Sequence, residues 1–127
     1  MTKRRPKNRH NQDLLKALKK LPNPIEDKWN GLLVFVEDGP ARSNQTRYEH
    51  IVQSHHRLKV RDIESIPEGI KGKAFFLKDE KKRKRTYNYF FRRKGSSDEF
   101  IKVSVQKDPK DPKVVRIKTI YITKAVK

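Results

Sequence analysis

The second half of the chain contains four runs of β-branched, aromatic and aliphatic residues, separated by short stretches rich in glycine, proline and charge. The runs cover residues 74–77, 86–93, 100–105 and 114–123. Apolar and polar residues alternate in the third run, which is the period of a strand with one buried face. Four such strands joined by short loops pair most simply in sequence order. This half of the chain therefore predicts a four-stranded antiparallel β-sheet.

The first half of the chain predicts helices. Leucines recur at helical spacing over residues 11–21, and a second helical pattern covers residues 46–58. Residues 62–70 predict a short helical turn that Pro67 and Gly69 interrupt. Together the two halves predict the α+β class, with N-terminal helices packed on a C-terminal four-stranded antiparallel β-sheet.

One apolar run stands between the first two predicted helices. Residues 32–36 read Leu-Leu-Val-Phe-Val, which suits a buried strand, and residues 37–40 follow as a turn. The chain has a single tryptophan, Trp29, just before this run. We expect its large apolar side chain in the core or at the edge of the core.

Length and composition bound how the chain is organised. It has 127 residues, enough for one compact domain, and only 33% of them are hydrophobic. Because these residues are clustered, they predict a modest core rather than a disordered chain. Residues 1–11 are rich in lysine and arginine and predict a flexible basic arm, ahead of a single domain over residues 12–127.

The net charge of +18, from 33 basic against 15 acidic side chains, indicates a polyanionic partner. Nucleic acid is the first candidate. An anionic membrane surface is the second, but the sequence shows no long amphipathic basic helix, and no stretch approaches the ~18 apolar residues of a membrane span. We therefore expect no membrane partner. The absence of cysteine from the sequence fits a cytoplasmic location.

Three of the four histidines of the chain fall within residues 50–56. Histidine is the side chain whose unperturbed pKa allows proton transfer near neutral pH. On an ideal helix His50 and His55 point about 140° apart. Both can serve one site only if the helix ends near Ser54 or the site wraps round its C-terminus. The alternative is a solvated helix whose histidines have no role.

Three motifs in order resemble a family, the phage-encoded branch of the Barnase–EndoU–colicin–RelE-like (BECR) ribonucleases. The residues that carry the resemblance are His50-Ile51 with His55, Asp62-Ile63 with Ile66-Pro67, and Ile117-Lys118-Thr119-Ile120-Tyr121. The match covers about residues 46–123. It implies a ribonuclease-like domain of phage, toxin-like or mobile-element origin that cleaves RNA without a metal, with the sheet as the substrate platform.

The chemistry of such a site can be stated from the reaction. RNA is cut when its own 2′-hydroxyl attacks the adjacent phosphorus, which requires a general base, a general acid and a cation at the phosphate. His50 and His55 fit the acid and base, in an order that the sequence leaves open, and Lys118 fits the phosphate role. Thr119 and Tyr121 are candidates to orient a phosphate oxygen or a histidine. A metal site is disfavoured because the histidines lack His-x-x-x-His spacing, so we expect no cofactor.

Further basic residues are predicted to contact nucleic acid. Arg116 is an alternative to Lys118 at the phosphate, and we expect these two side chains on one face of the last strand, with Thr119 and Tyr121 on the other. Three aromatic residues of the second run either stack on bases or pack against the helices; they are Tyr87, Tyr89 and Phe91. The predicted nucleic-acid-binding residues are Arg47, Arg92, Arg93, Lys102, Arg116 and the hairpin-tip residues Lys82, Arg83, Lys84 and Arg85.

The sequence supports three functions in decreasing order. The first is a metal-independent endoribonuclease with RNA as partner, tRNA being one candidate. A cytoplasmic ribonuclease needs restraint, which makes an inhibitor or immunity protein a candidate second partner. The next function is a non-catalytic basic nucleic-acid-binding module, in which charge acts and the histidines are incidental. The last is a basic structural or adaptor protein of a mobile element.

Overall fold

The computed structural model describes residues 8–37, 40–42, 45–54, 57–72, 74–78 and 86–124. The first half of the chain contains α1 (Asn8–Lys20), β1 (Ile25–Asp27), β2 (Leu32–Phe35), β3 (Pro40–Arg42), β4 (Gln45–Thr46), α2 (Arg47–Ser54), α3 (Val60–Glu64) and α4 (Ile66–Lys71). The second half contains β5 (Phe75–Lys78), β6 (Thr86–Arg92), β7 (Phe100–Lys107) and β8 (Val114–Thr123). The four strands expected in the second half are therefore confirmed.

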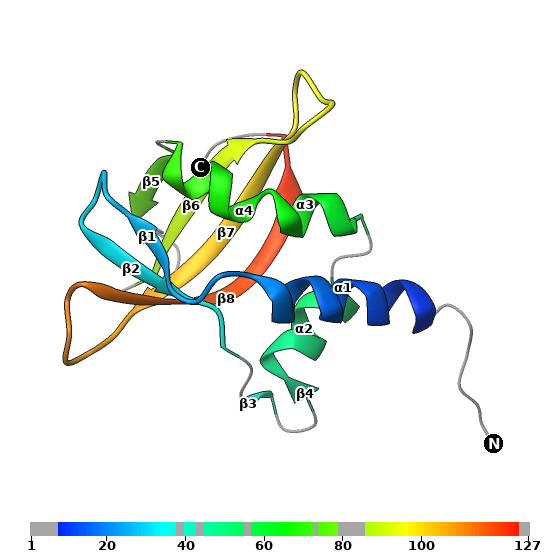
Figure 1. Ribbon diagram of the computed structural model, residues 1–127, viewed down its shortest axis with the longest axis horizontal. Helices are drawn as coiled ribbons and strands as arrows, with labels where there is room; N and C mark the ends of the chain where they lie inside the picture. The colour runs from blue at the N-terminus through cyan, green and yellow to red at the C-terminus, as the bar shows by residue number, and fades with distance from the viewer. Residues whose placement is uncertain are drawn as a thin grey trace.

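The sheet is larger than the sequence predicted. It has six strands in the order β1-β2-β8-β7-β6-β5 and curls into a half-barrel (Figure 1). All neighbours pair antiparallel except β2 and β8, which run parallel from the pair Leu33–Val114 to the pair Phe35–Arg116. The predicted four-stranded antiparallel sheet covered by N-terminal helices is thus wrong. The apolar run of the first half is a strand, as expected, but it joins the sheet through β8 and brings β1 with it as a hairpin.

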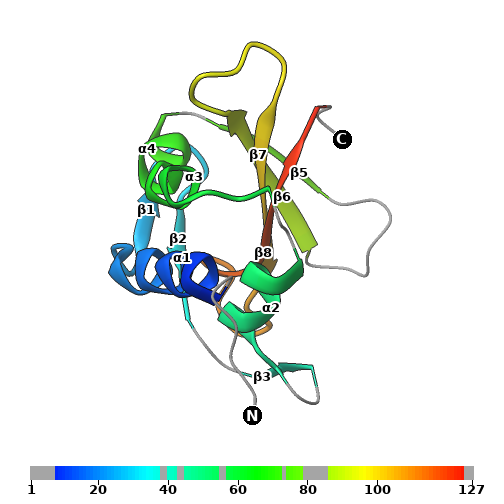
Figure 2. The same cartoon turned by 90° about the vertical axis from the view of Figure 1, so that its right-hand side faces the viewer.

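One face of the sheet, which we call the core face, is covered by the helices (Figure 2). Apolar side chains spaced along each helix meet alternate residues of the strands there, because a strand directs successive side chains to opposite faces. The buried cluster is continuous. Its members include Leu14, Leu18, Ile51, Val52, Ile63, Ile66, Ile70, Val34, Tyr89, Ile101, Val103, Val105, Val115, Ile117 and Ile120.

The opposite face, which we call the outer face, is defined by the strand register. Residues that pair directly across strands point to the same side. Phe90, which is buried but lies outside the core cluster, pairs with Lys102, and Lys102 pairs with Tyr121. The outer face of strands β5 to β8 therefore includes Phe75, Leu77, Asn88, Phe90, Arg92, Phe100, Lys102, Ser104, Arg116, Thr119 and Tyr121.

Helix boundaries differ from the prediction in places. α1 begins at Asn8, inside the predicted basic arm, and α2 ends at Ser54 rather than residue 58. The predicted single turn is two helices, and α4 continues through Pro67 and Gly69. Proline is tolerated there because it lies in the first turn, where the missing N–H has no helical partner. Gly69 lies directly against the Phe91 ring, leaving no room for a Cβ.

The position of Trp29 was also predicted wrongly. It lies in the turn between β1 and β2 with 59% of its surface exposed. Its indole Nε1 donates to the Lys71 carbonyl at 3.0 Å, while the Asp27 carboxylate accepts the backbone N–H groups of Trp29 and Asn30 at 3.0 and 3.2 Å. Gly31 completes the turn at φ +68°, which glycine adopts without strain. The turn is thus held by hydrogen bonds and does not depend on burying the indole.

Candidate nucleic-acid interface

The helix that carries His50 packs on β8, the strand that carries Lys118, Thr119 and Tyr121 (Figure 2). α2 begins at Arg47 because Thr46 and Glu49 form a reciprocal pair, in which each side chain accepts from the other's backbone N–H at 3.2 and 3.0 Å. Ile51 and Val52 are buried in the core, and the Tyr48 hydroxyl donates to the Val36 carbonyl at 3.2 Å. These contacts fix α2 against the sheet.

Arg47 links α2 directly to β8. Its guanidinium Nη1 donates to the Lys118 carbonyl at 3.5 Å. His50 follows Arg47 by three residues, so the two side chains lie on neighbouring parts of one side of the helix. Both are half-buried. On the helix the His50 side chain lies beside Arg47 and away from the buried Ile51 and Val52.

The register of β8 shifts at Lys118. Ile117 pairs with Val105, but Thr119 pairs with the preceding residue of β7, Ser104, so Lys118 is the extra residue of a β-bulge. The expectation that Arg116 and Thr119 lie on opposite faces is therefore wrong. With one residue added between them, Arg116, Thr119 and Tyr121 all belong to the outer face. Bulges often occur beside active sites, where they redirect side chains.

Cations lie over aromatic rings on the outer face. The Lys102 ammonium is 5.0 Å from the ring centroid of Tyr121 and 5.9 Å from that of Phe90. The Arg92 guanidinium carbon is 5.7 Å from the centroid of Phe100. Mixed surfaces of rings and cations suit single-stranded nucleic acid, because bases stack on rings while cations meet phosphates. Tyr87, Tyr89 and Phe91 belong instead to the core face, where Tyr89 is part of the buried cluster and the other two pack against it.

Arg93, predicted to bind nucleic acid, is buried in an ion-pair network. Its side chain is 8% exposed, and its guanidinium donates to both carboxylate oxygens of Asp62 at 3.0 Å, to Glu99 at 2.9 Å and to the Arg57 carbonyl at 3.3 Å. The Asp62 carboxylate raises the pKa of Arg93, and Arg57, followed by Arg93, lowers the pKa of Glu99. With its donors directed at these groups, Arg93 holds α3 to the end of β6 and does not present its charge to a ligand.

Arg116 is partly neutralised. It donates to Glu37 at 3.3 Å and to Asp108 at 2.9 Å, and its side chain is 44% exposed. The pKa of Asp108 is lowered by the Lys110 backbone N–H first and by Arg116 second. A phosphate would compete with these carboxylates for Arg116.

Some predicted site residues lie outside the described part of the chain. They are His55, Lys82, Arg83, Lys84 and Arg85. The pairing of the two histidines thus stays a prediction. Among the described residues, no three histidine, aspartate or glutamate side chains gather closely enough to hold a metal ion. The longest described helix, α1, has 13 residues, and none of the described helices is suited to crossing a membrane.

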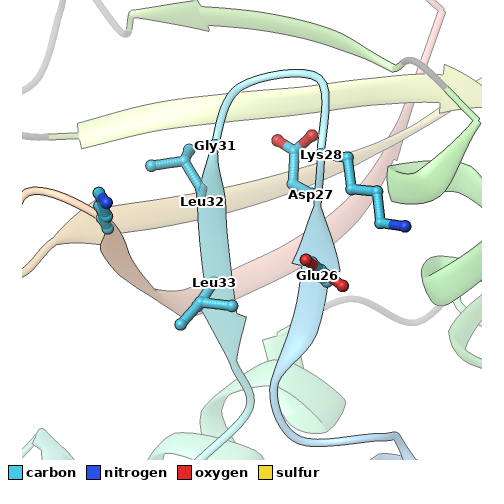
Figure 3. Close-up of a pocket in the computed structure, with 7 residues that line it drawn as sticks. Glu26, Asp27, Lys28, Gly31, Leu32 and Leu33 are labelled. Atoms are coloured by element: carbon cyan, nitrogen blue, oxygen red, sulfur yellow. The ribbon is translucent and has the colours of Figure 1, made fainter.

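Two hollows beside the β1–β2 hairpin were not anticipated. One, of about 380 Å³, is lined by Glu26, Asp27, Lys28, Gly31, Leu32, Leu33 and Lys113 (Figure 3). The other, of about 390 Å³, is lined by Glu26, Lys28, Trp29 and Lys71. The signal for the hairpin was present, since Asn-Gly at residues 30–31 is a strong turn pair. The strand before it was hidden because Ile25–Asp27 is short and two-thirds acidic.

Comparison with known proteins identifies no relative. No family model, no curated protein and no solved structure matches the chain.

Proposed function

We propose that this protein is an endoribonuclease that cleaves RNA by 2′-hydroxyl attack at the junction of α2 and β8, without a metal. The observation that supports the proposal is the hydrogen bond from the Arg47 guanidinium to the Lys118 carbonyl. It joins the helix of His50 to the strand of Lys118, Thr119 and Tyr121, although the segments are 71 residues apart in the chain. In the proposal, the His50 imidazole and the cationic side chains of Arg47 and Lys118 act together at this junction, as phosphodiester cleavage requires.

The roles follow from the chemistry of each group. His50 transfers a proton, either from the 2′-hydroxyl or to the leaving 5′-oxygen, and His55 performs the opposite transfer. The Lys118 ammonium balances the negative charge that grows on the phosphate oxygens in the transition state. Thr119 and Tyr121 belong to the outer face, and in the proposal their hydroxyls donate to a phosphate oxygen of RNA bound on that face. Arg47 holds α2 to β8 and adds a positive charge beside the scissile phosphate.

RNA reaches this junction across the outer face. The cations over rings at Lys102 and Arg92 provide a surface for bases and phosphates beside Tyr121. β2 pairs with β8 only as far as Arg116, so beyond that residue no described strand of this sheet lies on the β2 side of β8. A strand of RNA on the outer face can pass this edge toward His50. In the proposal the enzyme acts in the cytoplasm, with tRNA as a candidate substrate and an inhibitor protein as a candidate partner.

The test is cleavage of single-stranded RNA in excess chelator, with analysis of the fragment ends. The proposal expects fragments that end in a cyclic phosphate. His50→Gln, which keeps a polar side chain but loses the proton-transfer group, should reduce the rate ~10²–10⁴-fold. His10→Gln, a histidine of α1, is the matched control and should retain the wild-type rate. Cleavage that survives His50→Gln, or that stops only when metal is removed, would contradict the proposed site.

A second function, a non-catalytic nucleic-acid-binding module, is favoured by one observation of its own. The outer face combines cations with rings, and such a surface binds without chemistry. This alternative predicts tight binding that weakens steeply with salt and no fragments from wild type or variant. Measuring binding and cleavage on the same RNA separates the two functions.

A further inference from the structure

The indole of Trp29 is exposed and yet held in place. The side chain is 59% accessible, whereas aromatic side chains of this size are mostly buried. Its Nε1 donates to the Lys71 carbonyl at the end of α4, and its backbone N–H donates to the Asp27 carboxylate. An exposed ring fixed at both its backbone and its indole nitrogen loses little conformational entropy when a ligand stacks on it.

Charged side chains surround this ring. Glu26, Lys28 and Lys71 line the hollow of about 390 Å³ beside the indole. Figure 3 shows Glu26 on β1 and Lys28 just beyond the end of that strand, with the Lys28 side chain pointing away from the hairpin. The volume lies within the ~300–1,000 Å³ of small-ligand sites. The groups around this hollow match the parts of a nucleotide. The carboxylate can accept from amino groups of the base, the two ammonium groups can bind phosphates, and the indole offers a plane on which the base can stack.

We propose that the β1–β2 hairpin tip binds one unpaired, amino-bearing nucleobase of an RNA strand, stacked on Trp29. The Glu26 carboxylate accepts from the exocyclic amino group, as acidic side chains do with the amino group of cytosine. Lys28 and Lys71 contact the adjoining phosphates. The inference relies on the proposed function only for RNA as the ligand.

The tip is separate from the proposed catalytic junction. α2 contacts the chain just beyond the end of β2, at Val36, whereas Trp29 precedes the start of β2 at Leu32. Both views show the hairpin turn away from α2 (Figures 1 and 2). One RNA strand that reaches both places must cross the sheet, so the tip would select unpaired RNA at a distance from the cleaved bond. A base-paired helix offers no free base face for Trp29 and would not bind there.

Trp29 reports on its own occupancy because it is the only tryptophan in the chain. We would titrate the full chain with oligocytidine whose 2′-hydroxyls are methylated, which prevents 2′-hydroxyl attack, and record tryptophan fluorescence. Stacking should quench the emission. Methylated oligouridine, which has a carbonyl where cytosine has the amino group, should quench less at equal saturation, and a fully paired duplex should not quench. Oligocytidine that binds by anisotropy without quenching would overturn the inference.

Two variants sharpen the test. Trp29→Ala should weaken oligocytidine binding about tenfold, and Trp29→Phe should recover part of that loss. Glu26→Ala, which removes the hydrogen-bond acceptor, should abolish the preference for cytidine over uridine. Its control, Asp13→Asn, removes an exposed carboxylate from α1 and should strengthen binding of both oligomers equally, leaving the preference intact. A preference for cytidine that survives Glu26→Ala would show that Glu26 does not contact the base.

The outcomes distinguish this inference from the proposed function. If the ribonuclease proposal is wrong, no His50-dependent cleavage of RNA will be seen, but methylated oligomers will still quench the Trp29 fluorescence. If the hairpin-tip inference is wrong, His50-dependent cleavage will still be seen, but methylated oligomers will not quench the Trp29 fluorescence. Quenching by an acidic protein and not by RNA would assign the tip to a protein partner and overturn the inference.

Discussion

Arg92 and Arg93 are neighbours in the sequence, but they serve the molecule in opposite ways. Arg93 is buried and directs its guanidinium at two carboxylates and a backbone carbonyl. Arg92 is exposed, donates to the Ser97 carbonyl at 2.7 Å and lies over the ring of Phe100. The chain therefore uses its basic residues both to hold the fold together and to furnish a surface. The amino-acid composition alone does not distinguish these two roles of arginine.

The difference shows where the excess charge can act. A buried guanidinium that meets carboxylates contributes to the native structure and cannot release counterions from a nucleic acid. An exposed cation over a ring keeps its charge available and adds an apolar surface for a base. Substitutions on the two sides of the sheet should therefore separate stability from binding.

The largest effect is expected at the buried arginine. Arg93→Ala leaves the Asp62 carboxylate buried without its guanidinium and should lower the free energy of unfolding by about 3–5 kcal/mol. Urea denaturation followed by circular dichroism measures this change. The matched control is Arg92→Ala, which should change stability by about 0.5 kcal/mol or less because the side chain is exposed. Equal losses in the two variants would remove the distinction between the two arginines.

The next effect concerns the second buried polar cluster. The Tyr89 hydroxyl donates to the Asp27 carboxylate at 2.5 Å on the core face, and burial and this bond raise the pKa of Tyr89. Tyr89→Phe keeps the ring but removes one of the donors to a buried carboxylate, so it should cost about 2 kcal/mol of unfolding free energy. Thermal and urea unfolding measure the change. An unchanged unfolding free energy would show that the other hydrogen-bond donors to the Asp27 carboxylate are enough to stabilise it.

A smaller effect is expected in the acid dependence of stability. Arg57, followed by Arg93, lowers the pKa of Glu99 in the folded protein. A carboxylate with a lowered folded pKa contributes stability that is present above its unfolded value, about 4.3, and is lost as the pH falls through the folded pKa. Glu99→Gln should therefore flatten the decline of unfolding free energy below about pH 4. A variant with the wild-type slope would mean that other carboxylates carry the acid dependence.

The same contrast explains which features the sequence could predict. The strands from β5 to β8 were predictable because alternation of apolar and polar residues is a local signal. The burial of Arg93 was not, because its partners Asp62 and Glu99 lie 31 and 6 residues away and only the fold brings them together. The six-stranded sheet was missed for the same reason, since an apolar run does not reveal which strand it will pair with.

Two features of the candidate site depended on single residues. The bulge at Lys118 shifts the alternation of faces along β8 by one residue, so Arg116 and Thr119 lie on the same face. Nothing in the amino-acid composition of the strand indicates where the bulge lies. Trp29 was expected in the core because large apolar side chains are usually buried. Its exposure follows from the Asp27 hydrogen bonds that fix the turn. The junction of α2 and β8 joins segments that the sequence had singled out separately, but their contact needed the structure.

The smallest effect on stability, and the clearest one on binding, is expected on the outer face. Lys102→Met keeps the apolar stem between Phe90 and Tyr121 and removes the charge. Unfolding free energy should change by about 0.5 kcal/mol or less, while RNA affinity falls a few-fold and the slope of log affinity against log salt decreases by about one. Lys110→Met, on the exposed loop before β8, should alter that slope less. An unchanged salt dependence in Lys102→Met would show that RNA does not bind on the outer face. It would also contradict the proposed path of the RNA to His50.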